Sequence, residues 1–514
     1  MLLHRVTTTS ERVRATRSRL EKVDLLARTL RDSGTPEPGD DPADTARRIE
    51  VVADYLAGTL PQRTVGVGWR GLRELPEPAV EPALTVSEVD RALTALHELA
   101  GSGSAATRAA QVRDLLARAT ASEQQWLVGL VTGELRQGAG DGVLLPAIAR
   151  AADVPEALVR RAVMLAGFPG PVARAALEGG EAPLQQVCLE VGRPLRPMLA
   201  GSEPDVASAV DGGAELALDL KLDGIRVQVH LDRDAEVPVR LFTRSLEEIT
   251  DRLPEVVEAV TGLPARRAVL DGEVIVLDPD GRPAPFQVTG ARTASRTDPA
   301  ELARTTPVTT YLFDLLHLDG RDLVDEPASV RWEALAGLAP DLVVDRVQTA
   351  DPARAQAFFD EVVARGHEGV VVKDPQAPYA AGRRGAGWVK VKPRRTADLV
   401  VTGVEWGSGR RQGWLSTIHL AARGEDGELV MVGKTFKGMT DATLTWQTER
   451  FLALETHREG HVVHVRPEQV VEVAYDAVQT SRRYPGGVAL RFARVLRYRD
   501  DKSAEEADGL GSLR

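Results

Sequence analysis

The spacing of apolar residues changes near residue 195, and this change constrains the fold more than any other feature. Up to that point apolar residues recur at helical spacing, for example over residues 11–32, 122–138 and 155–167. Beyond it the chain consists of short alternating runs separated by Gly, Pro and Asp, which is typical of strands. The pattern therefore predicts a multidomain α+β protein with a helical part first.

The length supports this division, because 514 residues are more than one hydrophobic core normally holds. We expect an all-helical domain over residues 1–195 and a sheet-rich α+β domain over residues 196–396. Strand-like pieces at close spacing predict a small barrel over residues 397–505. A polar acidic tail, residues 506–514, follows.

Composition excludes several classes of protein. Cys188 is the only cysteine, so neither an internal disulfide nor a four-cysteine zinc site can form. No run approaches the roughly 18 apolar residues of a membrane span, and the first residues lack the apolar stretch of a secretory signal. We therefore expect a cytoplasmic protein with no membrane partner. Because the net charge is −11, nucleic acid would have to bind to local basic surfaces.

Lysine is rare in this chain, since only 8 of the 64 basic residues are lysines. The choice matters chemically, because a lysine can lose its proton and act as a nucleophile whereas an arginine cannot. Seven of the eight lysines lie at or after position 221. Random placement would scatter them evenly, so the remaining lysines are candidates for chemistry.

The first candidate is Lys221, in the segment ALDLKLDGIR at residues 217–226. Strand alternation places the three leucines of this segment on a buried face, and Lys221 on the opposite face with Asp219 and Asp223. Gly224 can adopt dihedral angles closed to other residues, which would let the chain turn beside a ligand. The alternative is an exposed strand end before a turn.

Further candidates are two lysines and two glutamates. In GWVKVKP, residues 387–393, a period of two places Lys390 and Lys392 on one face, where their charges repel unless an anion such as phosphate lies between them. A solvated edge strand is the alternative. Glu273 and Glu368 suit a hard cation such as Mg²⁺, although a single glutamate is more often a surface residue.

These segments resemble, in the same order, the motifs of the covalent nucleotidyltransferases. The matching segments are KLDGIR (221–226), FTRS (242–245), LDGE (270–273), YLFDLL (311–316), EGVVVK (368–373) and GWVKVKP (387–393). The resemblance implies an antiparallel-sheet nucleotidyltransferase domain over residues 196–396 and a C-terminal OB-fold barrel over residues 397–505.

The resemblance also implies a role for each position. Lys221 is the catalytic nucleophile that carries AMP. Glu273 and Glu368 hold the metal, Phe313 stacks on adenine, and Arg244 contacts both nucleotide and DNA. The implied nucleotide-binding residues are Asp219, Leu220, Arg226, Arg244, Glu273, Phe313, Lys390, Lys392, Arg499 and Lys502.

The two outer domains resemble those of ATP-dependent DNA ligases, of the bacterial and archaeal type with an N-terminal helical DNA-binding domain. Segment 489–503, ALRFARVLRYRDDKS, is similar to the family's last motif, in which Arg499 and Lys502 orient the leaving pyrophosphate. Segment 133–155 is similar to the DNA-binding domain. Its loop of small residues would present backbone N–H groups to DNA phosphates beside Arg136, the second predicted DNA contact.

The resemblance thus implies an enzyme that seals nicks between a 3′-hydroxyl and a 5′-phosphate through lysyl-AMP and adenylated DNA. ATP and Mg²⁺ or Mn²⁺ are the expected cofactors, and nicked duplex DNA is the expected partner of a monomer at the nucleoid. The barrel would cover ATP and then rotate about a hinge at residues 393–397. Two departures from the family pattern, Asp219 for glutamate and Ala493 for proline, remove no group needed for chemistry.

Three other functions share parts of this pattern. An RNA ligase or a capping-type nucleotidyltransferase uses the same lysine chemistry, but the 195-residue helical domain disfavours both. A NAD-dependent ligase is disfavoured because its zinc module needs four cysteines. A catalytically silent DNA-binding clamp could keep the fold, and only covalent labelling with AMP distinguishes it from an active enzyme.

Overall fold

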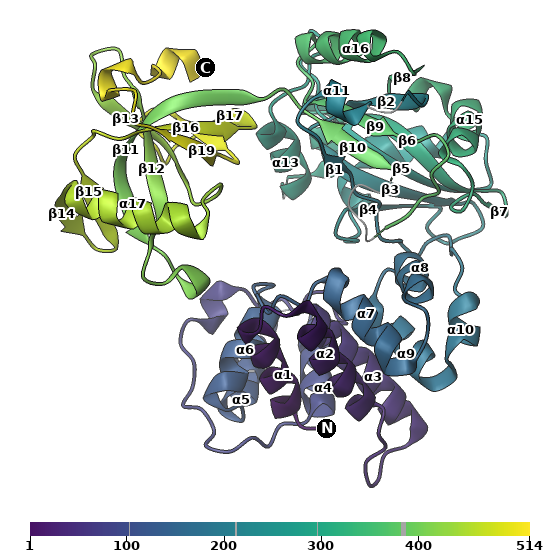
Figure 1. Ribbon diagram of the computed structural model, residues 1–514. Coiled ribbons are helices and arrows are strands. Elements are labelled where there is room, and N and C mark those ends of the chain that lie inside the picture. The colour runs from purple at the N-terminus through teal and green to yellow at the C-terminus, as the bar shows by residue number, and fades with distance from the viewer. Residues whose placement is uncertain (102, 211–212, 296, 382–386, 514) are drawn as a thin grey trace.

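The computed structural model describes residues 1–101, 103–210, 213–295, 297–381 and 387–513. Figure 1 shows three parts arranged around an open space: a helical part, a sheet-rich middle part and a sheet-rich C-terminal part. The predicted multidomain α+β class with a helical N-terminal region is confirmed. Within the ranges given above, no helix is long and apolar enough to cross a membrane.

The helical part packs its helices around one large apolar core. Its elements are α1 (Leu3–Ala15), α2 (Arg19–Ser33), α3 (Pro42–Ala57), η1 (Trp69–Leu72), α4 (Val86–Glu98), α5 (Ser104–Ala117), α6 (Ala121–Val131), α7 (Asp141–Ala152), α8 (Glu156–Ala166), α9 (Pro169–Gly179) and α10 (Glu181–Gln185). Capping boxes fix several helix starts. At α4, the Thr85 hydroxyl accepts from the Glu88 N–H at 3.2 Å, and the Glu88 carboxylate accepts from the Thr85 N–H at 2.9 Å.

Residues 11–32, whose periodicity resembles one helix, are divided between α1 and α2. The break follows from the side chain of Ser18, whose hydroxyl accepts a hydrogen bond from the backbone N–H of Glu21 at 3.3 Å. This bond satisfies an N–H group that has no partner within the helix, so a new helix begins after Ser18.

Two five-stranded sheets form the middle part. The first has the order β1 (Gly201–Ser202), β10 (Trp388–Val391), β9 (Gly369–Lys373), β2 (Leu216–Lys221) and β8 (Arg346–Thr349), and the second the order β4 (Val239–Thr243), β3 (Ile225–Asp232), β5 (Arg267–Ile275), β6 (Thr309–Leu318) and β7 (Arg321–Asp322). All printed strand pairs of both sheets are antiparallel except β1 with β10. This agrees with the antiparallel sheets expected for residues 196–396.

Short helices surround the two sheets (Figure 1). They are α11 (Val206–Ala209), η2 (Thr250–Arg252), α12 (Pro254–Thr261), α13 (Phe286–Ala294), α14 (Pro299–Thr305), α15 (Ala328–Leu338), η3 (Pro340–Leu342) and α16 (Pro352–Ala364). One buried ion pair joins a helix to a strand: Arg331 of α15 donates to both carboxylate oxygens of Asp314 on β6, at 2.7 and 2.9 Å. Both side chains are fully buried.

The C-terminal part is a seven-stranded sheet built on the long strand β11, with a separate hairpin. Its elements are β11 (Arg395–Trp406), η4 (Gly409–Arg411), β12 (Leu415–Arg423), β13 (Leu429–Thr435), α17 (Asp441–Ala453), β14 (Glu455–Glu459), β15 (Val462–Val465), β16 (Val470–Tyr475), β17 (Ala477–Thr480), β18 (Val488–Arg491), β19 (Arg494–Arg499), η5 (Ala504–Glu506) and η6 (Leu510–Leu513). Among the residues that the structure describes, the strand pairs close no ring. The OB-fold barrel therefore stays a prediction.

The last residues, expected as a polar tail, pack onto the C-terminal part. Leu513 is 4% exposed and belongs to its apolar core. The Asp508 N–H donates to the Asp398 carbonyl at 2.8 Å, and the Asp398 N–H donates to the Asp508 carboxylate at 2.8 Å. This segment has only a few apolar side chains among its polar residues, so its packing onto the C-terminal part was not evident from the sequence.

The buried pair of Arg331 and Asp314 generates a prediction about stability. Replacing Arg331 with Met leaves the Asp314 carboxylate buried without its cation, which costs about 3–5 kcal/mol. Hydrogen exchange of β6 in increasing urea measures this loss locally. Arg266→Met is the matched control, because Arg266 pairs with Asp234 at 2.8 Å on the surface of the same part. Equal protection of β6 in both variants would contradict the prediction.

Candidate active site

A cavity of about 1350 Å³ lies between the two sheets of the middle part and is bordered by the C-terminal part. The structure brings together in its lining ten of the residues predicted from the sequence: Asp219, Leu220, Lys221, Arg226, Arg244, Glu273, Phe313, Glu368, Lys390 and Lys392. Arg136, Arg499 and Lys502 do not line it. Residues far apart in the sequence, such as Asp219 and Lys392, which are 173 positions apart, thus share one site.

Lys221 is the last residue of β2, a strand held between β9 and β8. The predicted alternation holds, because Leu218, Leu220 and Leu222 all belong to the apolar core behind the strand. The Lys221 ammonium group donates to the Leu222 carbonyl at 3.1 Å and forms an ion pair with Glu368. The buried strand and these two contacts therefore hold the Lys221 amine at the cavity wall.

Gly224 serves close packing and not the left-handed turn that the sequence suggested. A Cβ atom at this position would lie 2.2 Å from the Val274 carbonyl oxygen on β5. The Gly224 N–H donates to the carboxylate of Glu273 at 2.8 Å. The absence of a side chain thus lets the turn after Lys221 touch β5 and orient Glu273.

Glu368 joins two of the cavity lysines, since its carboxylate forms ion pairs with both Lys221 and Lys392. Burial by itself would raise the pKa of Glu368, but the two ammonium groups outweigh burial and lower it. Lys390 has no ion-pair partner among the described residues. Burial, Lys392 and Lys221 all lower the pKa of Lys390, because each of them disfavours its charged form. A bound anion would stabilise that charge.

Glu273 and Glu368 are the carboxylates available for a metal. Burial raises the pKa of Glu273, and Lys221 opposes this shift. In the described part of the chain, no group of three or more His, Cys, Asp and Glu side chains could hold a metal ion. Two carboxylates fit Mg²⁺ when it binds together with the phosphates of a nucleotide, because this ion usually takes one or two carboxylates and completes its shell with substrate oxygens and water.

An aromatic wall with a buried cation forms the end of the cavity near Phe313. Its ring meets Trp388 edge to face, with centroids 5.8 Å apart, and the Lys373 ammonium lies 4.7 Å from the Phe313 ring. Lys373 pairs with Asp219 at 2.6 Å, and Arg346 donates to Asp219 at 2.8 Å. Asp219 is thus held between two cations at the site where the family pattern has glutamate.

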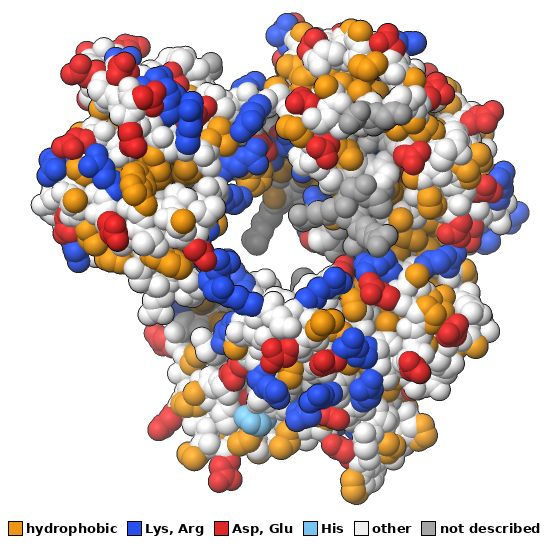
Figure 2. All heavy atoms as spheres, in the orientation of Figure 1, with side chains coloured by type: hydrophobic (Ala, Val, Ile, Leu, Met, Phe, Trp, Pro, Cys, Tyr) orange, Lys and Arg blue, Asp and Glu red, His pale blue; other side chains and the backbone are white. Residues whose placement is uncertain are grey.

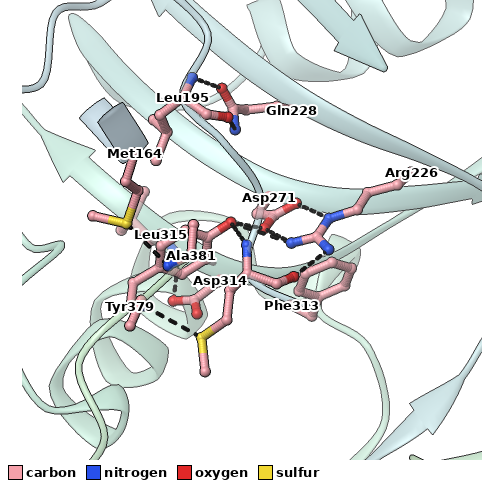
Figure 3. A network of polar contacts seen from close by, with 12 residues as sticks. Met164, Leu195, Arg226, Gln228, Asp271, Phe313, Asp314, Leu315, Tyr379 and Ala381 are labelled. Carbon is pink, nitrogen blue, oxygen red and sulfur yellow. Dashed lines mark hydrogen bonds and ion pairs between the residues drawn. The ribbon is translucent and has the colours of Figure 1, made fainter. Parts of the chain in front are cut away.

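Arg226 lies in a buried network beside this wall (Figure 3). It donates to Asp271 at 2.9 Å and to the Met198 carbonyl at 2.6 Å. The Tyr379 hydroxyl donates to Asp271 at 2.7 Å and accepts from the Met198 N–H at 3.0 Å. The guanidinium lies 5.4 Å from the centre of the Phe313 ring, so Arg226 packs against the aromatic wall.

Sequence reasoning missed several of these residues, and one of them had a visible signal. Trp388 precedes Lys390 by two positions in GWVKVKP, so the same period of two places all three side chains of Trp388, Lys390 and Lys392 on one face. Lys373 had a weaker signal, as one of the eight lysines and the last residue of EGVVVK. Tyr379 had none, because its partner Asp271 is distant in the sequence.

The C-terminal part touches the cavity through Arg491, which lies in the predicted last motif at 489–503, and through Asp476, which the sequence did not indicate. Arg491 forms an ion pair with Asp223 and lies 4.5 Å from the ring of Phe286. Asp476 pairs with Lys392 at 2.9 Å. These contacts bring the hairpin end of the C-terminal part against the entrance beside Lys221.

Arg499 and Lys502 face away from this cavity. Both form ion pairs with Asp398 on β11, at 2.9 and 2.6 Å, and Arg499 also pairs with Asp501 at 2.7 Å. In the arrangement of Figure 1 the C-terminal part therefore presents a different surface to Lys221. A role for these two cations in nucleotide chemistry requires that part to turn.

Arg244 and Arg136 occupy loops. Arg244 follows β4 at the rim of the cavity, and Arg136 is exposed in the loop between α6 and α7. Figure 2 shows lysine and arginine side chains on the surfaces that surround the open space between the three parts. The loop before α7 carries backbone N–H groups at a helix start, as the sequence predicted.

Comparison with known proteins agrees with this site. A family model described as ATP dependent DNA ligase domain matches residues 197–392, which include every motif around Lys221. Models described as DNA ligase N terminus and ATP dependent DNA ligase C terminal region match residues 73–149 and 411–502. The chain belongs to the ATP-dependent DNA ligase family.

Individual relatives of this ligase extend over its whole length. A probable DNA ligase of Beutenbergia cavernae is 56% identical, with 100% of this chain and 99% of the relative covered. A probable DNA ligase of Kineococcus radiotolerans is 57% identical, with the same coverage. The solved structure Pmar-Lig_PreS3 shares the fold, with a TM-score of 0.61 and 20% identity over 96% of this chain and 99% of that one. The family resemblance noted in the sequence is confirmed.

The close approach at Gly224 generates a prediction for this ligase. Gly224→Ala places a methyl group against β5 and displaces the turn that follows Lys221, so we expect the rate of covalent AMP formation to fall by about tenfold or more. Gly337→Ala in α15 is the matched control, because a Cβ atom there has no heavy atom within 4 Å. Labelling with radioactive ATP measures both variants. Normal labelling of Gly224→Ala would show that the turn does not position Lys221.

Proposed function

We propose that this ligase seals nicks in duplex DNA in three chemical steps, with Lys221 as the nucleophile of the first. The observation that carries the proposal is the position of the Lys221 amine in a cavity with Lys390, Lys392, Glu368 and Glu273. A cavity with this charge pattern suits a nucleoside triphosphate, because its cations can bind phosphates and its carboxylates can hold a metal.

In the first step the deprotonated amine of Lys221 attacks the α-phosphorus of ATP. A phosphorus–nitrogen bond forms, the bond from the α-phosphorus to the bridging oxygen breaks, and pyrophosphate leaves. Lys390 and Lys392 bind the oxygens on which negative charge develops. Mg²⁺ or Mn²⁺, held by Glu273 and Glu368 with the triphosphate, would supply further positive charge for the leaving group.

The nucleotide base fits the aromatic end of the cavity. Phe313 supplies a ring on which adenine can stack, and Asp219 and Leu220 border the same end. Arg226 supports the wall through its contacts with Asp271 and Met198. The α-phosphate would then lie between the base and the two lysines Lys390 and Lys392.

The second and third steps act on DNA. The 5′-phosphate of the nick attacks the phosphorus of lysyl-AMP, and Lys221 leaves. The 3′-hydroxyl then attacks the activated 5′-phosphate, a phosphodiester bond forms, and AMP leaves. Arg244 at the cavity rim and Arg136 on the helical part are the proposed DNA contacts, and the open space of Figure 2 would receive the duplex.

The C-terminal part, which we propose to be an OB-fold domain, takes two positions in this cycle. In one position Arg499 and Lys502 face ATP and orient the pyrophosphate. In the other, Arg491 and its neighbours border the cavity as in the present structure. The proposed hinge is residues 393–397, of which the last three begin β11 and pair with β16, so rotation would centre on the two residues before the strand. We propose that the ligase acts as a cytoplasmic monomer on nucleoid DNA.

The nucleophile is tested by Lys221→Arg. The guanidinium keeps the positive charge but cannot provide a neutral amine, so covalent labelling with AMP should be lost while binding to nicked duplex persists. The matched control is Lys434→Arg, because Lys434 lies on β13 and pairs with Glu405 away from the cavity. Retention of AMP by Lys221→Arg after denaturation would refute the assignment and favour another lysine. A wild-type enzyme without covalent AMP would be a silent clamp.

The rotation of the C-terminal part is tested by Lys502→Ala. If Lys502 acts on pyrophosphate, this variant should label slowly with ATP yet seal a nick that already carries AMP on its 5′-phosphate at a nearly normal rate. Lys390→Ala is the contrasting variant, because Lys390 lies beside the reacting phosphate in every step and should slow both reactions. Equal loss of both reactions in Lys502→Ala would assign Lys502 to folding or DNA binding instead.

A further inference from the structure

The turn that carries Arg244 forms one rim of the active-site cavity. It connects β4 to the chain that follows, and the Thr243 N–H donates to the Glu247 carbonyl at 2.8 Å. The Leu246 N–H donates back to the Thr243 carbonyl at 2.9 Å, which closes the turn. Thr243, Arg244 and Ser245 all line the cavity. Any displacement of this short turn therefore moves the Arg244 side chain.

Leu246 holds the turn in a conformation that leucine rarely adopts. Its φ angle is 66°, in the left-handed region, and its side chain is only 5% exposed. Such a backbone costs energy and persists only where surrounding contacts impose it. The contacts come from the helical part: the Leu246 side chain lies against Gly167, within 3.3 Å of the position that a Cβ atom would take there.

The second contact of Leu246 is a hydrogen bond from Arg63. The Arg63 guanidinium donates to the Leu246 carbonyl at 2.8 Å across the boundary between the two parts. It also lies 4.7 Å from the centre of the Phe168 ring, directly before α9. The stacking fixes the direction of the guanidinium, so the donor is placed by the helical part itself.

We propose that Arg63 is a positioning residue for the steps on DNA: through Leu246 it holds Arg244 at the rim of the cavity while the helical part is docked. The proposal rests on the proposed function. Arg244 has no ion-pair or hydrogen-bond partner for its side chain in the described ranges, so its cation is available to a DNA phosphate. Lys221 and Lys390, by contrast, lie on the other sheet of the middle part, and the turn after β4 is not part of that sheet.

The experiment uses the full-length enzyme and separates the chemical steps. With saturating nicked duplex that already carries 5′-AMP, Arg63→Ala should seal about tenfold more slowly than wild type. Its labelling by ATP should fall by a clearly smaller factor, because Lys221 and Lys390 lie on the other sheet and Arg244 is only one of several nucleotide contacts. Arg63→Lys should recover most of the sealing rate, because an ammonium group can still donate to the Leu246 carbonyl.

Arg161→Ala is the matched control. Arg161 also bridges the helical and middle parts, through an ion pair with Asp325 at 2.7 Å, but Asp325 does not line the cavity. Sealing by this variant at saturating DNA should therefore equal that of wild type. An equal loss in Arg161→Ala and Arg63→Ala would mean that docking alone matters, and the proposal would be wrong.

Leu246→Ala provides a test from the other side of the contact. It removes the packing against Gly167, so it should slow sealing as Arg63→Ala does, and the double variant should be no slower than the slower single variant. Additive losses would overturn the proposal, as would a defect of Arg63→Ala that vanishes at saturating DNA or that appears equally in labelling by ATP. Failure of the proposed function would be seen separately, as absence of covalent AMP on the wild-type enzyme.

Discussion

The ion pairs of Glu368 with Lys221 and Lys392 are the interaction on which the site depends. Lys221, Lys390 and Lys392 lie together in the cavity, and their mutual repulsion must be compensated for the protein to fold without a bound nucleotide. Glu368 pairs with Lys221 and Lys392, Asp476 also pairs with Lys392, and a phosphate can neutralise Lys390, which has no ion-pair partner among the described residues. The first sheet of the middle part explains this proximity: β2, β9 and β10 are neighbours, Lys221 and Lys390 lie on β2 and β10, and Glu368 and Lys392 directly precede β9 and follow β10.

The same principle operates at the aromatic end of the cavity, where Asp219 lies between Lys373 and Arg346. These charges come from three neighbouring strands of the first sheet, and Arg346 also donates to the Phe313 carbonyl of the second sheet at 3.1 Å. The network of Figure 3 extends this support to the helical part, because the Ala381 N–H donates to the sulfur of Met164 on α8 at 3.2 Å. The helical part is therefore joined to the active site by a shared core as well as by polar contacts.

Local patterns predicted much of this arrangement. The change of period near residue 195, the alternation around Lys221 and the pairing of Lys390 with Lys392 are short-range features, and the structure reproduces each of them. The reason for Gly224 was misjudged, because close contact with β5 depends on a strand 50 residues away and leaves no mark in the local sequence. Partners such as Tyr379 with Asp271, and the surface that the C-terminal part presents to Lys221, depend on tertiary structure in the same way.

The central claim is that Lys221 carries AMP between ATP and DNA. Peptide mapping by mass spectrometry, on the wild-type enzyme incubated with ATP and Mg²⁺ and then denatured, tests it most directly. The account predicts adenylate on the peptide that contains Lys221, and its loss when nicked duplex or pyrophosphate is added before denaturation. An unmodified Lys221 peptide together with adenylate on another lysine would contradict the account.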